Sequence, residues 1–170
     1  AYYTDFEPEH CWVACEAGQV VGFLTGCFDT RQHDRVFRRR ILPAVCGGWL
    51  AGKYRVGPKT ARYFAAAVGA ALRGEIAAAD VSRYPAHLHI NLLPGARGKG
   101  LGRSLMAHYL GQLREAGVPG VHLQTTSLNV IACRLYETAG FALVAEKPTR
   151  MYAHLVAQPV TTRCYGMKIC

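Results

Sequence analysis

The order of apolar and polar positions divides the chain into short strands and amphipathic helices. Alternation over Cys11 to Cys15 and Val20 to Phe28, with a glycine-containing turn between them, predicts a β-hairpin. An apolar run from His87 to Leu93 predicts a central strand, and Leu101 to Ala116 has the spacing of an amphipathic helix. Because a helical crossover joins strands in parallel, Val121 to Thr126 is predicted to lie parallel to the central strand.

The last third of the chain continues in the same way. A second helix is predicted after Asn129, a good N-cap, and it ends at Gly140, which tolerates the left-handed stop conformation. The apolar stripe of this helix includes Tyr136, whose side chain is therefore expected to face the sheet. Phe141 to Tyr152 and Thr161 to Ile169 predict an antiparallel ending. The predicted fold class is α/β, a twisted mixed sheet flanked by helices.

One segment, from about Asp29 to Tyr84, does not fit this strand and helix pattern and reads as an insertion. It predicts a short helix before Pro43, a glycine-rich turn at Gly47 and Gly48, and an alanine-rich helix from Thr60 to Ala79. We expect these helices to form the acceptor-side wall of any site on the sheet. The prediction is a single domain over residues 1–170 with a helical basic insertion at about 29–84.

Composition narrows the function classes. The net charge is +9, and between Arg31 and Arg62 nine Lys or Arg residues stand against the single acid Asp34. A strongly basic chain can bind nucleic acids or anionic surfaces. This sequence has no RNA-binding aromatic signature, zinc-finger spacing or heptad repeat, so we expect no specific nucleic-acid partner. The apolar runs are too short to cross a bilayer, and the sequence shows no secretion signal. We therefore expect a cytoplasmic protein that does not bind a membrane.

The cysteines point to neither a metal centre nor a disulfide framework. There are seven of them, an odd number, at scattered positions without a C-x-x-C pair. Free and mostly buried thiols are therefore predicted, and no metal.

Candidate chemistry begins with Arg97-Gly98-Lys99-Gly100-Leu101-Gly102, which lies between the central strand and its helix. Glycines at alternate positions let the backbone wrap closely, and the free amides of a helix start attract a phosphate group. A Walker loop needs Ser or Thr where Gly100 stands, and a dinucleotide fingerprint needs glycine where Arg103 stands. Both of these commoner phosphate loops are excluded.

A second segment makes the pattern specific. Residues 129–141 read N-x-x-A-x-x-L-Y-x-x-x-G-F, and together with the R-G-K-G-L-G loop they resemble the GNAT superfamily of acyl-CoA-dependent N-acyltransferases over about residues 86–152. Within that superfamily, the run from Tyr84 to Pro94 looks most like the acetyltransferase-like domain of O-GlcNAcases and its free-standing bacterial relatives.

The resemblance implies acetyl-CoA as the cofactor and a sheet whose two central parallel strands splay apart. The pantetheine arm would pair with the exposed edge of the central strand, and the pyrophosphate would lie on the amides of the glycine loop. The cofactor-binding residues implied in this way are Ile90, Asn91, Leu92, Arg97, Gly98, Lys99, Gly100, Leu101, Gly102, Arg103 and Asn129.

The resemblance also assigns catalytic roles. Tyr136 matches the general acid that protonates the departing sulfur. Some members carry a glutamate base where this chain has Gln124, so the base role is open. Ala-His-Leu-His resembles the paired-histidine strand of serotonin N-acetyltransferase, which makes His89 the candidate, with His87, His122 or a water as alternatives.

Two functions follow from this pattern. One is an N-acetyltransferase that moves an acetyl group from acetyl-CoA to a primary amine, small molecule or peptide, by direct attack in a ternary complex. The other is a catalytically inactive pseudo-acetyltransferase that serves as a binding module. A monomer or a homodimer is expected in either case.

Overall fold

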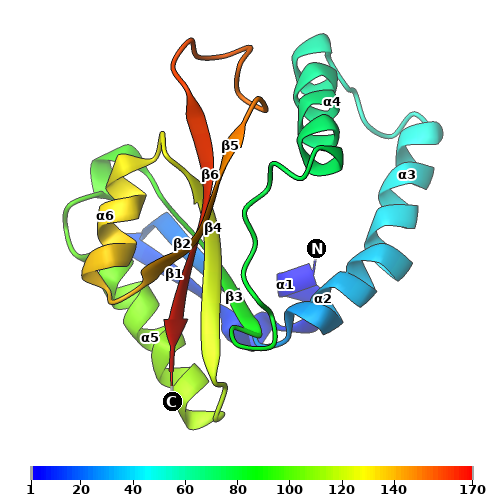
Figure 1. Cartoon of the computed structure of the whole chain (residues 1–170). Coiled ribbons are helices and arrows are strands. Elements are labelled where there is room, and N and C mark those ends of the chain that lie inside the picture. Colours follow the sequence, from blue (N-terminus) through cyan, green and yellow to red (C-terminus); the bar gives the residue numbers. More distant parts are fainter. Residues whose placement is uncertain (1, 170) are drawn as a thin grey trace.

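The computed structural model describes residues 2–169 and contains a six-stranded, twisted mixed sheet with the order β1-β2-β3-β4-β6-β5 (Figure 1). β3 and β4 run parallel, and every other neighbouring pair is antiparallel. The predicted fold class is confirmed. The strands are β1 (Cys11–Glu16), β2 (Gln19–Cys27), β3 (Ala86–Leu92), β4 (Gly120–Thr126), β5 (Ala142–Thr149) and β6 (Val160–Lys168).

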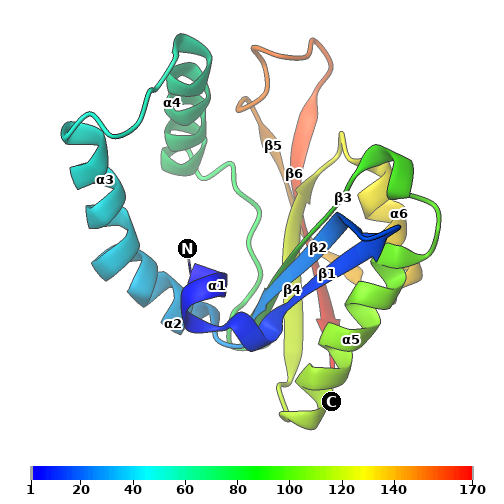
Figure 2. The same ribbon diagram turned by 180° about the vertical axis from the view of Figure 1, so that it is seen from behind.

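Helices lie on both sides of this sheet (Figures 1 and 2). They are α1 (Tyr2–Phe6), α2 (Thr30–Val36), α3 (Leu42–Leu50), α4 (Pro58–Leu72), α5 (Leu101–Glu115) and α6 (Val130–Thr138). Two 3-10 turns, Pro8–His10 and Pro94–Ala96, and a π-helical turn at Phe37–Ile41 complete the set. None of the helices described is long and apolar enough to cross a membrane.

The core lies between α5, α6 and the sheet. Leu24, Leu88 and Leu113 are almost completely buried there, together with Tyr109 of α5. The Tyr109 hydroxyl lies 2.9 Å from the carbonyl oxygens of both Cys27 and His87, so a buried polar group is satisfied by the backbone of β2 and β3. This contact holds the crossover helix against the strands that carry the site.

The first half of the insertion differs from its prediction. α2, the π turn and α3 form one continuous helical stretch over residues 30–50, where the sequence predicts a short helix that stops before Pro43. Proline has no N–H to donate and crowds the preceding turn. The wider π turn accommodates it, with the Leu42 N–H bonded to the Phe37 carbonyl.

The predicted turn at Gly47 and Gly48 is also wrong, because both residues lie inside α3. Neither has a positive φ; the left-handed residue after α3 is Gly52, at φ +70°. A Cβ atom at Gly48 would come within 2.7 Å of the Tyr54 ring, so this glycine makes room for a neighbour instead of turning the chain.

The alanine-rich helix is shorter than predicted. α4 ends at Leu72, and Gly74 follows at φ +67°. Beyond it the Ala77 N–H donates to Thr162 Oγ1 at 2.9 Å, and that hydroxyl donates to the Glu75 carbonyl at 2.7 Å. Contacts with β6 therefore replace the helical hydrogen bonds that the alanine content favours.

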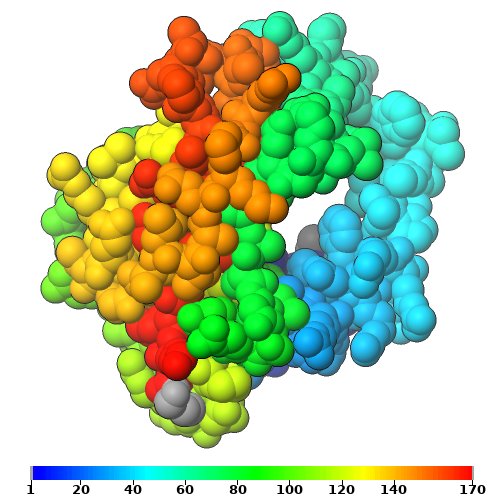
Figure 3. All heavy atoms as spheres, in the orientation of Figure 1, coloured from blue at the N-terminus to red at the C-terminus, as the bar shows by residue number. Residues whose placement is uncertain are grey.

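In the space-filling view an opening lies between the helical stretch of α2 and α3 and the segment that returns from α4 to the sheet (Figure 3). Six cysteines lie within the described residues, and all six are free thiols; Cys170 lies outside those residues.

Candidate functional site

A cleft opens where the two parallel strands separate. β3 pairs with β2 from His87 to Leu92, but with β4 only at Ala86 and His87. Beyond that point the β4-facing edge of β3 has no strand beside it. The cleft is lined by Ile90, Asn91, Leu92, Arg97, Asn129, Ile131, Ala132, Leu135 and Tyr136.

The glycine loop places the start of α5 at one end of this cleft. Gly98 and Gly100 have φ values of +78° and +83°, which residues with a side chain rarely adopt. Gly102 is needed for another reason: a Cβ atom there would lie 3.1 Å from Leu135 and 3.2 Å from Leu92. Gly102 thus lets α5 pack closely against α6 and β3. As in any helix, the first amides of α5 have no intrahelical acceptor and carry partial positive charge.

The charged side chains of the loop have different surroundings. Arg97 lines the cleft, and its Nε donates to the Leu92 carbonyl at 3.2 Å. Lys99 is half-exposed and pairs with Glu16 at 2.6 Å. Arg103 is exposed on the first turn of α5. Of the three, only Arg97 lies in the cleft in this structure.

Tyr136 lies on the wall that α6 contributes, and its side chain is only 6% exposed. The sequence prediction that it faces the sheet is confirmed, since its ring packs near Phe141 and Tyr165. Its hydroxyl makes no hydrogen bond to any residue in the described range 2–169. Burial raises the pKa of this phenol to about 12, so it holds its proton at neutral pH.

Asn129 lies at the N-cap of α6, as the sequence predicts. Its side-chain oxygen accepts the Ala132 N–H at 3.3 Å, which caps α6, and the residue lines the cleft opposite β3. The cleft therefore contains every predicted cofactor residue except those of the glycine loop after Arg97, which lie at the start of α5 next to it.

A second pocket lies along the same strand: His89 lines it and Ile90 lines the cleft, and these consecutive strand residues point to opposite faces of β3. The start of α2 and the returning segment of the insertion form its far wall, whereas α3 and α4 contribute no lining residue. The pocket is lined by Tyr3, Thr30, His33, Asp34, Ala78, Ala79, Val81, His87, Leu88, His89, His122, Leu123 and Gln124.

His87 is fixed in the neutral form. Its Nε2 lies 2.8 Å from the Tyr3 hydroxyl, and its Nδ1 lies 2.7 Å from Thr30 Oγ1. Since the Thr30 hydroxyl donates to the Pro85 carbonyl, Nδ1 carries the proton and Nε2 accepts from Tyr3. Burial, followed by the nearby histidines, lowers the pKa of His87 to about 2. Both ring nitrogens are occupied, so His87 has a structural role.

Two other predicted residues are also engaged with the protein. His122 is buried, its Nδ1 lies 2.9 Å from the Tyr84 carbonyl, and burial lowers its pKa. Gln124 donates from Nε2 to the Ala77 carbonyl at 2.9 Å. The residue at the position of the family's glutamate therefore anchors the insertion.

His89 is on the same face as His87, as the period-two spacing predicts, with ring centroids 5.7 Å apart. It is exposed, although the surrounding protein and His33 lower its pKa. His33 and Asp34 were not predicted as site residues: their only signal was that Asp34 is the single acid in a basic segment. The structure brings both to the pocket from α2.

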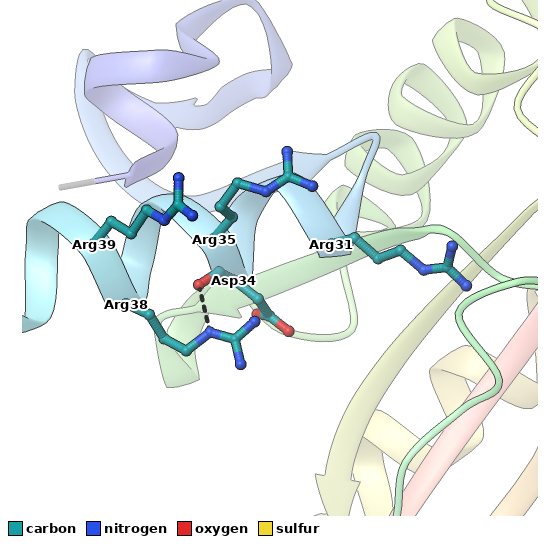
Figure 4. A pocket seen from close by; sticks show the side chains of 5 residues that line it. All are labelled: Arg31, Asp34, Arg35, Arg38 and Arg39. Carbon is teal, nitrogen blue, oxygen red and sulfur yellow. Dashed lines mark hydrogen bonds between the residues drawn. The ribbon is translucent and has the colours of Figure 1, made fainter.

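A cluster of guanidinium groups adjoins this pocket through Asp34, which lines both cavities. The arginines are Arg31, Arg35, Arg38 and Arg39, on α2 and the π turn. In Figure 4 the side chains of Arg35 and Arg39 point to one side of the helix, Asp34 and Arg38 point to the other, and Arg31 extends away from Asp34. None of the four forms an ion pair with a carboxylate of residues 2–169. Arg38 Nε bonds to the Asp34 backbone carbonyl at 3.3 Å.

Residues 1–141 match the sequence profile of the Acetyltransferase (GNAT) family. The chain belongs to the GNAT family. Among curated GNAT-type relatives, the mycothiol acetyltransferase of Nocardiopsis dassonvillei is 50% identical over 50 residues, which are 29% of this chain and 15% of that protein. The streptothricin acetyltransferase of Streptomyces lavendulae is 43% identical over 53 residues, 31% of this chain and 28% of that protein. The matches thus span less than a third of either relative.

Solved structures extend the GNAT comparison to the whole chain. SsHAT is 34% identical with a TM-score of 0.69, and the alignment covers 99% of this chain and 76% of that one. A putative acetyltransferase from Salmonella typhimurium, solved with its cofactor acetyl-CoA, has a TM-score of 0.54 at 16% identity, covering 94% of this chain and 64% of that one. At that identity the likeness shows the GNAT fold alone.

Proposed function

We propose that this chain is an N-acetyltransferase that transfers an acetyl group from acetyl-CoA to a primary amine by direct attack in a ternary complex. One observation carries the proposal. The cleft between β3 and α6 has a glycine-loop helix start at its end and, on its wall, the largely buried Tyr136, whose hydroxyl makes no hydrogen bond within residues 2–169.

The residues of the cleft fit such a cofactor in three respects. The unpaired edge of β3 from Ile90 to Leu92 offers backbone groups to an extended amide chain. The turn at Gly98 and Gly100 exposes amides with partial positive charge, which suits a diphosphate. Solved GNAT relatives that contain acetyl-CoA support the same assignment.

Bound acetyl-CoA supplies an acetyl group activated as a thioester. Tyr136 supplies the proton that the departing sulfur requires, and its raised pKa of about 12 keeps that proton in place until charge develops nearby.

The acceptor enters from the histidine-lined pocket, which lies across β3 from the cleft, with His89 on one face of the strand and Ile90 on the other. Its neighbouring arginines favour an acceptor that carries a carboxylate or phosphate besides its amine. Four unpaired cations within nine residues repel one another on a helix, and an anionic group would relieve that repulsion.

Two measurements test the function. Acetyl-CoA at about 100 times its dissociation constant should stabilise the fold by roughly 2.7 kcal/mol, which thermal denaturation detects. A panel of amines assayed by release of free thiol should then identify acceptors. Stabilisation without turnover on any amine would favour the pseudo-acetyltransferase, and absence of both would overturn the cofactor assignment.

A further inference from the structure

The reaction proposed above needs a group that takes a proton from the acceptor amine, and Gln124 cannot do so. The histidine-lined pocket contains four histidines from three separate segments: His33, His87, His89 and His122. Their ring nitrogens are not equally available. The choice among them follows from the hydrogen bonds that each ring makes.

Two of the four are occupied. Tyr3 and Thr30 take both nitrogens of His87. Nδ1 of His122 faces the Tyr84 carbonyl, and the residue is buried, which opposes the positive charge that a base acquires. His89 is exposed, and no hydrogen bond to a residue of the described chain orients its ring.

His33 is held differently. Its Nδ1 lies 3.1 Å from Asp34 Oδ1, and its side chain is 19% exposed where that of Asp34 is 55% exposed. The ring packs edge-on against Tyr2 at 4.5 Å and His87 at 4.8 Å, and it stacks with Tyr3 at 5.6 Å. Within residues 2–169 its Nε2 makes no hydrogen bond.

A carboxylate bonded to one imidazole nitrogen fixes the tautomer and stabilises the imidazolium that forms when the other nitrogen accepts a proton. The aromatic rings fix the plane of His33 in the same way that packing fixes catalytic side chains elsewhere. Asp34 keeps its outer oxygen toward solvent and the pocket, so the pair does not need to bury an uncompensated charge.

We propose that His33, oriented by Asp34, is the general base of this chain. As the amine nitrogen attacks the thioester carbonyl carbon, its N–H bond breaks and the proton passes to His33 Nε2. The C–S bond breaks as Tyr136 gives its proton to the sulfur, and both side chains return to their starting states by exchange with water. This assignment rests on the proposed function and adds a residue from the insertion to it.

The titratable groups that face His33 come from three elements. Asp34 is its neighbour on α2, Tyr2 and Tyr3 face it from α1, and His87 and His89 face it from β3. Only Asp34 among these is negatively charged at neutral pH. Replacing it by asparagine removes the counter-charge of the imidazolium and should therefore lower kcat/KM.

The experiment is the pH profile of kcat/KM for the best amine of the panel, measured for the wild type, His33→Gln, Asp34→Asn and His89→Gln. His108→Gln is the matched control, because His108 is exposed on α5, where its Nδ1 bonds only to the Ser104 carbonyl. We expect His33→Gln to lower kcat/KM about 100-fold and to abolish the acidic limb, while the dissociation constant of acetyl-CoA stays unchanged.

The outcomes separate this inference from the function on which it rests. If the wild type acetylates an amine and His33→Gln keeps both its rate and its acidic limb, or if His89→Gln loses both, His33 is not the base. Asp34→Asn tests the pair with the His33 ring in place, and it should leave the fold intact because the Asp34 side chain is half-exposed; an unchanged kcat/KM in this variant contradicts the assignment. If the wild type acetylates no amine, both proposals fall.

Discussion

The cleft and the histidine-lined pocket both lie along β3, on opposite faces of the strand, and they are built in different ways. Two continuous segments supply the cleft, residues 90–103 and 129–136, and much of what they offer is backbone. The pocket draws on α1, α2, the returning segment of the insertion, β3 and β4, and it offers side chains. A ligand that is the same in every family member can thus be bound by a short sequence motif. A ligand that differs between members is bound by side chains from segments that are far apart in the sequence.

We expect the largest effect from a substitution that removes the general acid of the cleft and leaves the histidine-lined pocket unchanged. Tyr136→Phe removes a hydroxyl that makes no hydrogen bond to residues 2–169, so its cost in stability should be small. Loss of the general acid should lower kcat about 100-fold. Steady-state kinetics with thiol detection measure this, and unchanged turnover would remove Tyr136 from the chemistry.

The next effect concerns His87 of the pocket and the pH dependence of the free energy of unfolding. In the folded state the pKa of His87 is about 2, against about 6.5 when unfolded. Above pH 6.5 both states are neutral, and the stability is fully present. As the pH falls from 7 to 5 only the unfolded state gains the proton, so folding loses about 2 kcal/mol from this residue.

Denaturant unfolding at pH 7 and pH 5 measures that loss. His87→Asn removes the titrating ring and should flatten the dependence on pH, although it lowers stability at both values. A wild type as stable at pH 5 as at pH 7 would contradict the hydrogen-bond pattern of Thr30 and Tyr3 around His87.

A smaller effect tests the backbone of the cleft. Gly100→Ala places a side chain at φ +83° and should cost about 1 kcal/mol of stability, with weaker binding of acetyl-CoA. Gly111→Ala is the control on the same helix, where a Cβ meets nothing within 4 Å and alanine should stabilise by about 1 kcal/mol. Calorimetric titration and thermal denaturation of both variants check the difference.

The smallest effect concerns the arginines beside the pocket. The double variant Arg35→Gln/Arg38→Gln should raise KM for an anionic amine about threefold at low salt and leave that of its neutral analogue unchanged, because exposed charges act weakly and are screened. Arg114→Gln, an exposed change on α5, is the control. Equal effects on the two amines would exclude an anion site here.

Local signals made the sheet and the cleft predictable. Alternation located the hairpin, an apolar run located β3, the glycine loop located the start of α5, and the cap at Asn129 located α6 within a residue or two. The insertion was harder because its signals conflict. Proline predicts a break that the π turn absorbs, and the alanine content predicts helix where contacts with Thr162 favour an irregular chain.

The sequence by itself determined the family's sheet, the position of the helix start and the buried phenol on α6, because each depends on residues within a few positions of one another. Only the tertiary structure decided which histidine nitrogens are bonded and which are free. Those facts depend on contacts between distant segments, such as Thr30 with His87, 57 residues apart, and Ala77 with Gln124, 47 residues apart, and no periodicity in the chain records them.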